Sequence, residues 1–399
     1  MLIRAMTRLL LVCVVFGCGA TGALAQAESP PQVAVQDSGP QYGSGRPAGH
    51  QGHKWENRNV TLDSGPIRYT LKYSACVDPS HPDSRVFEEG YIGMPGPAAC
   101  NWYHSGFMFI SLNGQEVGSY PLVDMRVTET GDRGGFHMVW DTPDATMRLQ
   151  FLLRPGANHL DSNLTWVPKP GKTVSAVALR LVCYPSYFTA WNHRQGDRHL
   201  VTPRLNEREP KTAELDPAQD TYLYYPDNIF DMAKGEGEGP CAMMFLPDRI
   251  VGDPQIKSGR VNIGGYAVTT QLQVAPEAKR VRLAFWDFAG KTNAEAAAYL
   301  KANAATVQQE LAALDFRPEP VAKLDVPRLT AEATKTLAEA GEDAKPYRAK
   351  VEGFLQKVAD LKPRADAGDW KAEADLANVI GEYTTVMWKV RMQALLNRP

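Results

Sequence analysis

The chain has 399 residues, a formal net charge of -2 at neutral pH, 44% hydrophobic residues and 22% charged residues. These values are typical of an average soluble protein and lack the basic excess that phosphate backbones select for. They exclude nucleic acid as an expected partner. They also allow a core of ordinary size, in two domains or in one large domain with an appendage.

The first 25 residues have the pattern of a secretory signal peptide. Arg4 and Arg8 form a positive segment, an apolar run follows from residue 9 to residue 16, and Ala23-Leu24-Ala25 offers small residues for cleavage. A bilayer needs about 20 apolar residues, and no segment of the chain reaches that length, so no transmembrane segment is expected. The pattern predicts export to the periplasm or to the outside of the cell.

A lipid anchor is the alternative to soluble export. Val15-Phe16-Gly17-Cys18 resembles the lipobox of bacterial lipoproteins, in which Cys18 would be acylated. Phe16 occupies a position where a small residue is usual, so soluble export is favoured.

Four cysteines remain after the signal peptide, at Cys76, Cys100, Cys183 and Cys241. An even number in an oxidising compartment predicts disulfide bonds, and pairing by nearest neighbour in sequence favours Cys76 with Cys100 and Cys183 with Cys241. Buried thiols are the alternative. A zinc site is disfavoured because no CxxC spacing occurs.

Residues 26–54 are rich in Pro, Gly, Gln and Ser and are expected to form a disordered linker. Residues 55–290 then show period-two alternation, which is clearest from Ile67 to Tyr73 and recurs from Val177 to Cys183, from Val268 to Val274 and from Val281 to Phe285. Turn residues at short intervals predict about ten to twelve strands without intervening helices. The fold class is therefore mainly β, an antiparallel β-sandwich with a supersandwich as its larger variant.

Two hairpins are expected within this domain. Phe107 to Leu112 runs into Asn113-Gly114, a pair that accepts positive φ at both turn positions. Phe136 to Trp140 and Met147 to Leu153 are expected to pair across a Pro-containing turn.

Residues 291–399 change to helical periodicity and are expected to form a C-terminal α-helical region. Thr292 and Glu295 have the spacing of a capping box, which predicts a helix start. Further helices are expected over 329–340, over 347–361 with a break at Pro363, and over 370–396. Their apolar stripes can pack as a bundle, wrap the sandwich, form a dimer or bind an envelope partner.

No established catalytic motif is present, so neither a cofactor nor a metal is predicted. Three clusters combine aromatic with polar residues at expected strand ends or loops. A sugar presents C–H groups that stack on aromatic rings and hydroxyls that bond polar side chains, so these clusters are candidate ligand-binding residues for an oligo- or polysaccharide. They are Trp102 and His104, then Trp191, Asn192, His193 and Arg194, and then Trp286 and Asp287. Packing of the same aromatics in the core is the alternative.

If the site is enzymatic, a histidine could act as general acid or base with a carboxylate. The candidate histidines are His104, His137, His193 and His199, and the candidate carboxylates are Glu88, Glu89 and Asp287.

The segment from residue 225 to residue 302 resembles parts of uncharacterised exported proteins of environmental bacteria. The residues that carry the resemblance are Gly239-Pro240-Cys241, Gly264-Gly265-Tyr266 and Phe285-Trp286-Asp287-Phe288. The long run of antiparallel strands is similar to the β-supersandwich of galactose-mutarotase-like carbohydrate-active proteins. That resemblance implies a fold and a substrate class, and no catalytic residue is transferred from it.

An exported carbohydrate-binding protein is thus the favoured hypothesis. A carbohydrate-active lyase, hydrolase or epimerase and a non-catalytic structural protein of the envelope are the alternatives.

Overall fold

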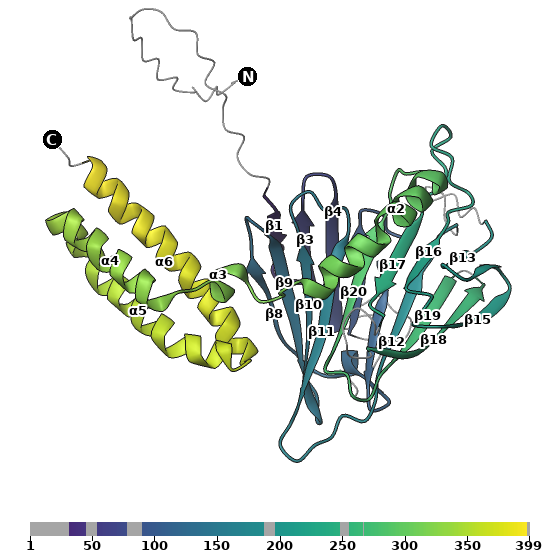
Figure 1. The fold of residues 1–399 in the computed structure, drawn as a ribbon, viewed down its shortest axis with the longest axis horizontal. Coiled ribbons are helices and arrows are strands. Elements are labelled where there is room, and N and C mark those ends of the chain that lie inside the picture. The colour runs from purple at the N-terminus through teal and green to yellow at the C-terminus, as the bar shows by residue number, and fades with distance from the viewer. Residues whose placement is uncertain are drawn as a thin grey trace, which may run out of the picture. The chain divides into compact units, whose positions relative to one another are not determined.

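The computed structural model describes residues 32–44, 54–77, 90–186, 196–247, 255–265 and 267–396. In these ranges twenty strands form two antiparallel sheets, and helices follow them in the chain (Figure 1). The predicted fold class, an antiparallel β-sandwich followed by a C-terminal helical region, is confirmed.

The first sheet has eleven strands in the described ranges, in the order β1-β3-β4-β5-β6-β12-β19-β18-β15, with β2 paired to β3 and β7 to β6. Its strands are β1 (Ala34–Asp37), β2 (Gln41–Ser44), β3 (Lys54–Asp63), β4 (Arg68–Cys76), β5 (Tyr91–Gly96), β6 (Met108–Leu112), β7 (Gln115–Glu116), β12 (Val177–Cys183), β15 (Lys211–Leu215), β18 (Ile256–Gly264) and β19 (Ala267–Val274).

The second sheet has nine strands in the described ranges, in the order β14-β13-β16-β17-β20-β11-β10-β9-β8. These strands are β8 (Leu122–Glu129), β9 (Gly134–Asp141), β10 (Ala145–Leu153), β11 (Leu160–Pro168), β13 (His199–Val201), β14 (Asn206–Arg208), β16 (Tyr222–Tyr225), β17 (Cys241–Phe245) and β20 (Arg280–Asp287).

The alternation read from the sequence is reproduced in strands of the first sheet such as β4, β18 and β19, whose buried residues alternate with more exposed ones. In β4, Tyr69, Leu71 and Tyr73 are buried in the core between the sheets. Both predicted hairpins are present, the first turning at Asn113 and Gly114 with φ of 50° and 83°. The strands are shorter and more numerous than expected, because elements such as β7 and β13 span only two or three residues.

Helix α2 (Asn293–Ala313) covers the outer face of the second sheet (Figure 1). Thr292 and Glu295 form the predicted capping box. The apolar side of α2, with Leu300, Val307 and Leu311, packs on outward side chains of β17 and β20. These strands are therefore buried on both faces.

The remaining helices are α3 (Glu319–Ala322), α4 (Val326–Ala340), α5 (Lys345–Asp366) and α6 (Trp370–Leu396), and 3-10 turns lie at Val117–Ser119 and Gly341–Ala344. Helices α4, α5 and α6 share an apolar core that includes Val351, Phe354 and Val390. The expected break at Pro363 is wrong, because this proline lies in the last turn of α5 and the helix continues to Asp366. In the described part of the chain, no helix is both long and apolar enough to cross a membrane.

Two polar contacts, one of them buried, connect α6 to the second sheet. Arg148 on β10 donates from Nη2 to Oε1 of Glu373 on α6 at 2.6 Å, and both side chains are buried. Arg126 on β8 donates to Asp375 at 2.8 Å. The first turn of α6 is thus held to strands that lie more than two hundred residues earlier in the chain.

Candidate functional site

A cavity on the outer face of the first sheet combines aromatic and polar side chains. It has a volume of about 380 Å³, and its walls include Tyr103, Ser105, Phe109, Arg180, Tyr184 and Thr269. The alternation that buries Leu179 and Leu181 of β12 places Arg180 between them on the opposite face. The strand order β6-β12-β19 then brings the outward residues of three strands to one surface.

The floor of the cavity is a cross-strand pair. Arg180 lies directly opposite Phe109 of β6, and its guanidinium carbon is 3.7 Å from the centroid of the ring. Arg180 also approaches Glu116 of β7, with 3.3 Å between Nη2 and Oε1. The planar guanidinium therefore has a fixed position while several of its N–H groups remain for other acceptors.

The aromatic wall is formed by Tyr103 and Tyr184, whose rings meet edge to face with centroids 4.2 Å apart. Backbone hydrogen bonds from Tyr184 to the carbonyls of Cys100 and Asn101 hold the two segments together. The ring of His104 lies 4.7 Å from that of Tyr103, and its Nδ1 is 3.0 Å from the carbonyl of Ala99. His104 is therefore next to the cavity wall, as a neighbour of Tyr103.

The structure brings Trp102 and Trp286 together, but in the interior. Nε1 of Trp102 donates to the carbonyl of Trp286 at 2.9 Å, and both side chains are 0% exposed. Trp102 packs between the sheets against Phe107, and Trp286 faces α2. The predicted stacking of a sugar on these two rings is wrong for this structure, because their faces are covered by the core.

Asp287 is also buried, and it fixes a turn of the first sheet. Its Oδ1 accepts from Nδ2 of Asn101 at 2.9 Å, and its Oδ2 accepts from the backbone N–H of Ala98 at 3.2 Å. Burial raises the pKa of the Asp287 carboxyl to about 8, although the hydrogen bond from Asn101 acts in the opposite direction. The predicted contact of Asp287 with a ligand in solvent is not available in this arrangement.

The cluster Trp191, Asn192, His193 and Arg194 lies outside the described residues, as do Glu88, Glu89 and Cys18. Their predicted roles stay predictions.

The remaining candidate histidines are not paired with Asp287. His137 on β9 is fully buried on the outer side of the second sheet, where its Nε2 is 3.0 Å from Oδ2 of Asp124. Nε of Arg148 donates to Nδ1 of His137 at 3.2 Å. This arrangement requires a neutral imidazole with its proton on Nε2. His199 on β13 has its Nε2 next to Oδ1 of Asn206, so it too is engaged in a local contact.

Acidification is expected to destabilise the protein through His137. Burial, with Arg148 facing Nδ1, lowers the pKa of His137 to about 4, whereas an unfolded histidine titrates near pH 6.5. The unfolded chain therefore binds more protons between these two values, and stability is lost as the pH falls from 6.5 to 4. We expect this group to cost about 2 to 3 kcal/mol of unfolding free energy over that window.

Chemical denaturation at several pH values measures this effect. The variant His137→Gln should show a shallower loss than the wild type. An unchanged slope in His137→Gln would contradict the assignment.

A second cavity, of about 470 Å³, lies beside the turn that Asp287 holds, and its walls include Pro97, Phe230, Met232 and Glu238. Burial raises the pKa of Glu238, whose Oε2 accepts from the backbone N–H of Cys100 at 2.9 Å. The Gly-rich acidic run at residues 235–239 is held by Asp227, which accepts from the N–H groups of Glu238 and Gly239. The carboxylates of Asp227 and Glu238 therefore stabilise the loop by accepting hydrogen bonds from backbone N–H groups.

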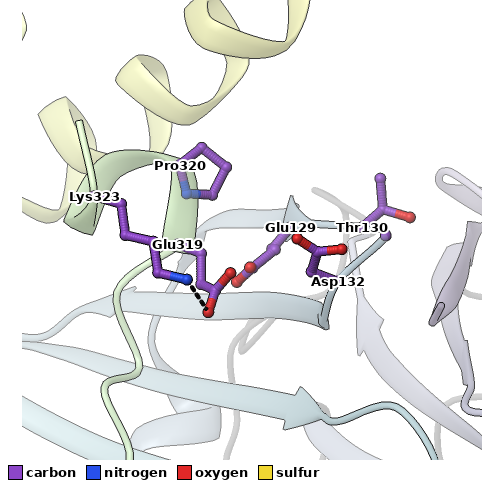
Figure 2. A pocket seen from close by; sticks show the side chains of 7 residues that line it. Glu129, Thr130, Asp132, Glu319, Pro320 and Lys323 are labelled. Carbon is purple, nitrogen blue, oxygen red and sulfur yellow. Dashed lines mark ion pairs between the residues drawn. The ribbon is translucent and has the colours of Figure 1, made fainter. Parts of the chain in front are cut away.

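A third cavity, of about 370 Å³, lies between the β8–β9 turn and α3. Figure 2 shows the carboxyl groups of Glu129, Asp132 and Glu319 directed into one space, with Lys323 paired to Glu319 at 2.9 Å. Glu129 is already bound by Arg133 at 2.8 Å. In the part of the chain that the structure describes, no group of three or more His, Cys, Asp or Glu side chains is arranged to hold a metal ion.

The two predicted disulfides are not formed, and all four cysteines are present as thiols. Cys183 and Cys241 are buried on strands of opposite sheets, where their Sγ atoms donate to the carbonyls of Val268 and Asn101. Burial is the main reason that the pKa of Cys241 is raised far above its usual value. This structure therefore contains free thiols, of which Cys76, Cys183 and Cys241 are buried and Cys100 is partly buried.

The sequence clusters did not include Arg180 and Phe109, although strand alternation indicates that both side chains face outward. In β12, Val177, Leu179, Leu181 and Cys183 face the core, so Arg180 between them faces outward. Phe109 faces outward from β6 in the same way. A search of outward positions would have found both, but only strand order shows that they are neighbours.

Neither a protein-family model nor a curated protein matches this chain. Among solved structures, the GH36 α-galactosidase AgaA from Geobacillus stearothermophilus matches with 13% identity and a TM-score of 0.30, over 57% of this chain and 40% of that chain. A doubly substituted form of the same enzyme, in complex with stachyose, matches over the same shares, with 12% identity and a TM-score of 0.31.

The chain thus spans 40% of the length of these solved structures. Matches with TM-scores of this size transfer neither a site residue nor an activity to this chain. The class that the fold defines is a two-sheet β-sandwich protein with a C-terminal helical region.

Proposed function

We propose that this protein binds carbohydrate in the cavity of about 380 Å³ on the outer face of its first sheet, and that it acts as an exported protein at the cell envelope or outside the cell. The observation that carries the proposal is the wall of Tyr103 and Tyr184 beside the stacked pair of Phe109 and Arg180. Aromatic rings offer a surface for the C–H face of a sugar.

Polar groups next to the rings suit the hydroxyls of the same sugar. Ser105 and Thr269 line the cavity with hydroxyls that can donate and accept, and Arg180 adds donors only. Gly264, which also lines the cavity, faces open space, since a Cβ built on it would have no heavy atom within 4 Å. The opening therefore leaves room for a chain of sugars to continue along the sheet.

The variant Tyr103→Ala should weaken glycan binding about tenfold, because loss of one aromatic stacking contact costs about 1.4 kcal/mol. Binding of a panel of polysaccharides by affinity electrophoresis measures this effect. Tyr42, which is 58% exposed on β2 of the same sheet, provides the matched control Tyr42→Ala, which should bind as the wild type does.

Circular dichroism should show that both variants retain the fold. If the wild type binds no polysaccharide of the panel, or if Tyr103→Ala binds as tightly as the wild type, the proposed function is wrong.

A further inference from the structure

Arg180 is the one charged residue among those that line the carbohydrate cavity in the described part of the chain. Its contact with Glu116 is a single approach of 3.3 Å, and its side chain is 34% exposed. A guanidinium has five N–H donors, so most of them are not used by this carboxylate. The cavity therefore presents a fixed positive charge to its ligand.

A second arginine lies in the same row of the sheet. Gln271 of β19 is opposite Arg180 of β12, and Arg260 of β18 is opposite Gln271. Neighbouring strands are about 4.8 Å apart, so the Cα atoms of the two arginines are roughly 10 Å apart. Gln271 and Arg260 are exposed. The row thus extends the cavity along the sheet as a polar strip.

The N–H groups of Arg260 are only weakly engaged by other residues of the protein. Its Nε is 3.5 Å from Oε1 of Glu214, and the two side chains are 60% and 75% exposed. An ion pair this exposed contributes little and exchanges readily with other partners. Next to it, Asn262 and Thr269 are opposite each other across β18 and β19 and add neutral hydrogen-bonding groups.

This spacing suits a ligand that repeats both its apolar faces and its negative charges. The fork of a guanidinium matches the two oxygens of a carboxylate, and such pairs are stronger than hydrogen bonds between neutral groups. On the foundation of the proposed carbohydrate binding, we infer that the ligand is an acidic polysaccharide whose sugars carry carboxylates, with Arg180 binding one uronate and Arg260 a further one along the strip.

Polygalacturonate and its fully methyl-esterified form test this inference, because they share a backbone and differ in charge. The wild type should bind polygalacturonate at least tenfold more tightly, and 0.5 M NaCl should remove most of that difference. Arg180→Gln should weaken binding of polygalacturonate about tenfold and binding of the ester by a clearly smaller factor, because only the charged polymer also loses an ion pair. Arg328→Gln, at an exposed arginine of α4, is the matched control and should have no effect.

The outcomes separate this inference from the proposed function. Equal affinity for both polymers, with Tyr103→Ala weakening both, would overturn the acidic ligand and leave carbohydrate binding in place. Tighter binding of dextran sulfate than of polygalacturonate would overturn the carboxylate in favour of sulfate. If the protein binds neither these polymers nor any other polysaccharide, the proposed function itself is wrong.

Discussion

Replacing Asp287 with alanine is expected to lower the free energy of unfolding at pH 5 by about 3 kcal/mol, the upper end of the cost of leaving a buried hydrogen-bonding group without its partner. The carboxyl group is buried, and its oxygens accept from Asn101 and from the backbone of Ala98. Removing it leaves both donors without their acceptor in the interior. It also releases the turn that positions Trp102 and the start of the cavity wall.

Denaturant unfolding monitored by tryptophan fluorescence measures this loss. Asp132→Ala, at an exposed carboxylate in the turn after β8, is the matched control and should change stability by less than about 0.5 kcal/mol. If Asp287→Ala is as stable as this control, Asp287 does not hold the turn.

The effect of Asp287→Ala should also depend on pH. The native carboxyl keeps its proton up to a pKa of about 8, whereas the unfolded one releases it near pH 4. The stabilising contribution of Asp287 is therefore fully present below pH 4 and is lost as the pH rises through 8. The difference in stability between wild type and Asp287→Ala should narrow from pH 5 to pH 8, and a widening difference would contradict the raised pKa.

Replacing Glu373 with alanine should release the first turn of α6 from the second sheet. Glu373 is the partner of the buried Arg148, and truncating one member of a buried ion pair costs about 3 to 5 kcal/mol because the other charge is left uncompensated. Arg148 also donates to His137, so the substitution should also weaken the hydrogen bond that holds the imidazole on β9. Hydrogen exchange should show faster exchange of the α6 amides in the variant.

Glu382→Ala provides a control on the same helix, at an exposed position, and should exchange as the wild type does. The double variant Arg148→Ala Glu373→Ala should be less destabilised than the sum of the two single variants, because neither charge is then left alone. Additive losses would show that the pair is not coupled.

The strand pattern and the helix starts could be predicted because each depends on residues close together in the chain. The alternation of Tyr69, Leu71 and Tyr73 reports that one side of a strand meets the core, and Thr292 with Glu295 satisfies the free amides of its own helix. The same local rules misjudged Trp286, because β20 is covered by the other sheet on one side and by α2 on the other. The alternation of Val281, Leu283 and Phe285 identifies the side of β20 that faces the other sheet, but it does not show that α2 covers the opposite side, where Trp286 lies.

The sequence by itself determined the mainly β character of residues 55–290, the outward phase of Arg180 and the start of the first C-terminal helix. Only the tertiary structure decided that Phe109, Arg180 and Arg260 share one surface, since β6, β12 and β18 lie far apart in the chain and become near neighbours through the order of the sheet. Side-chain alternation shows to which face of its own strand a residue points. Which residues meet depends on non-local pairing, and no local pattern encodes that pairing.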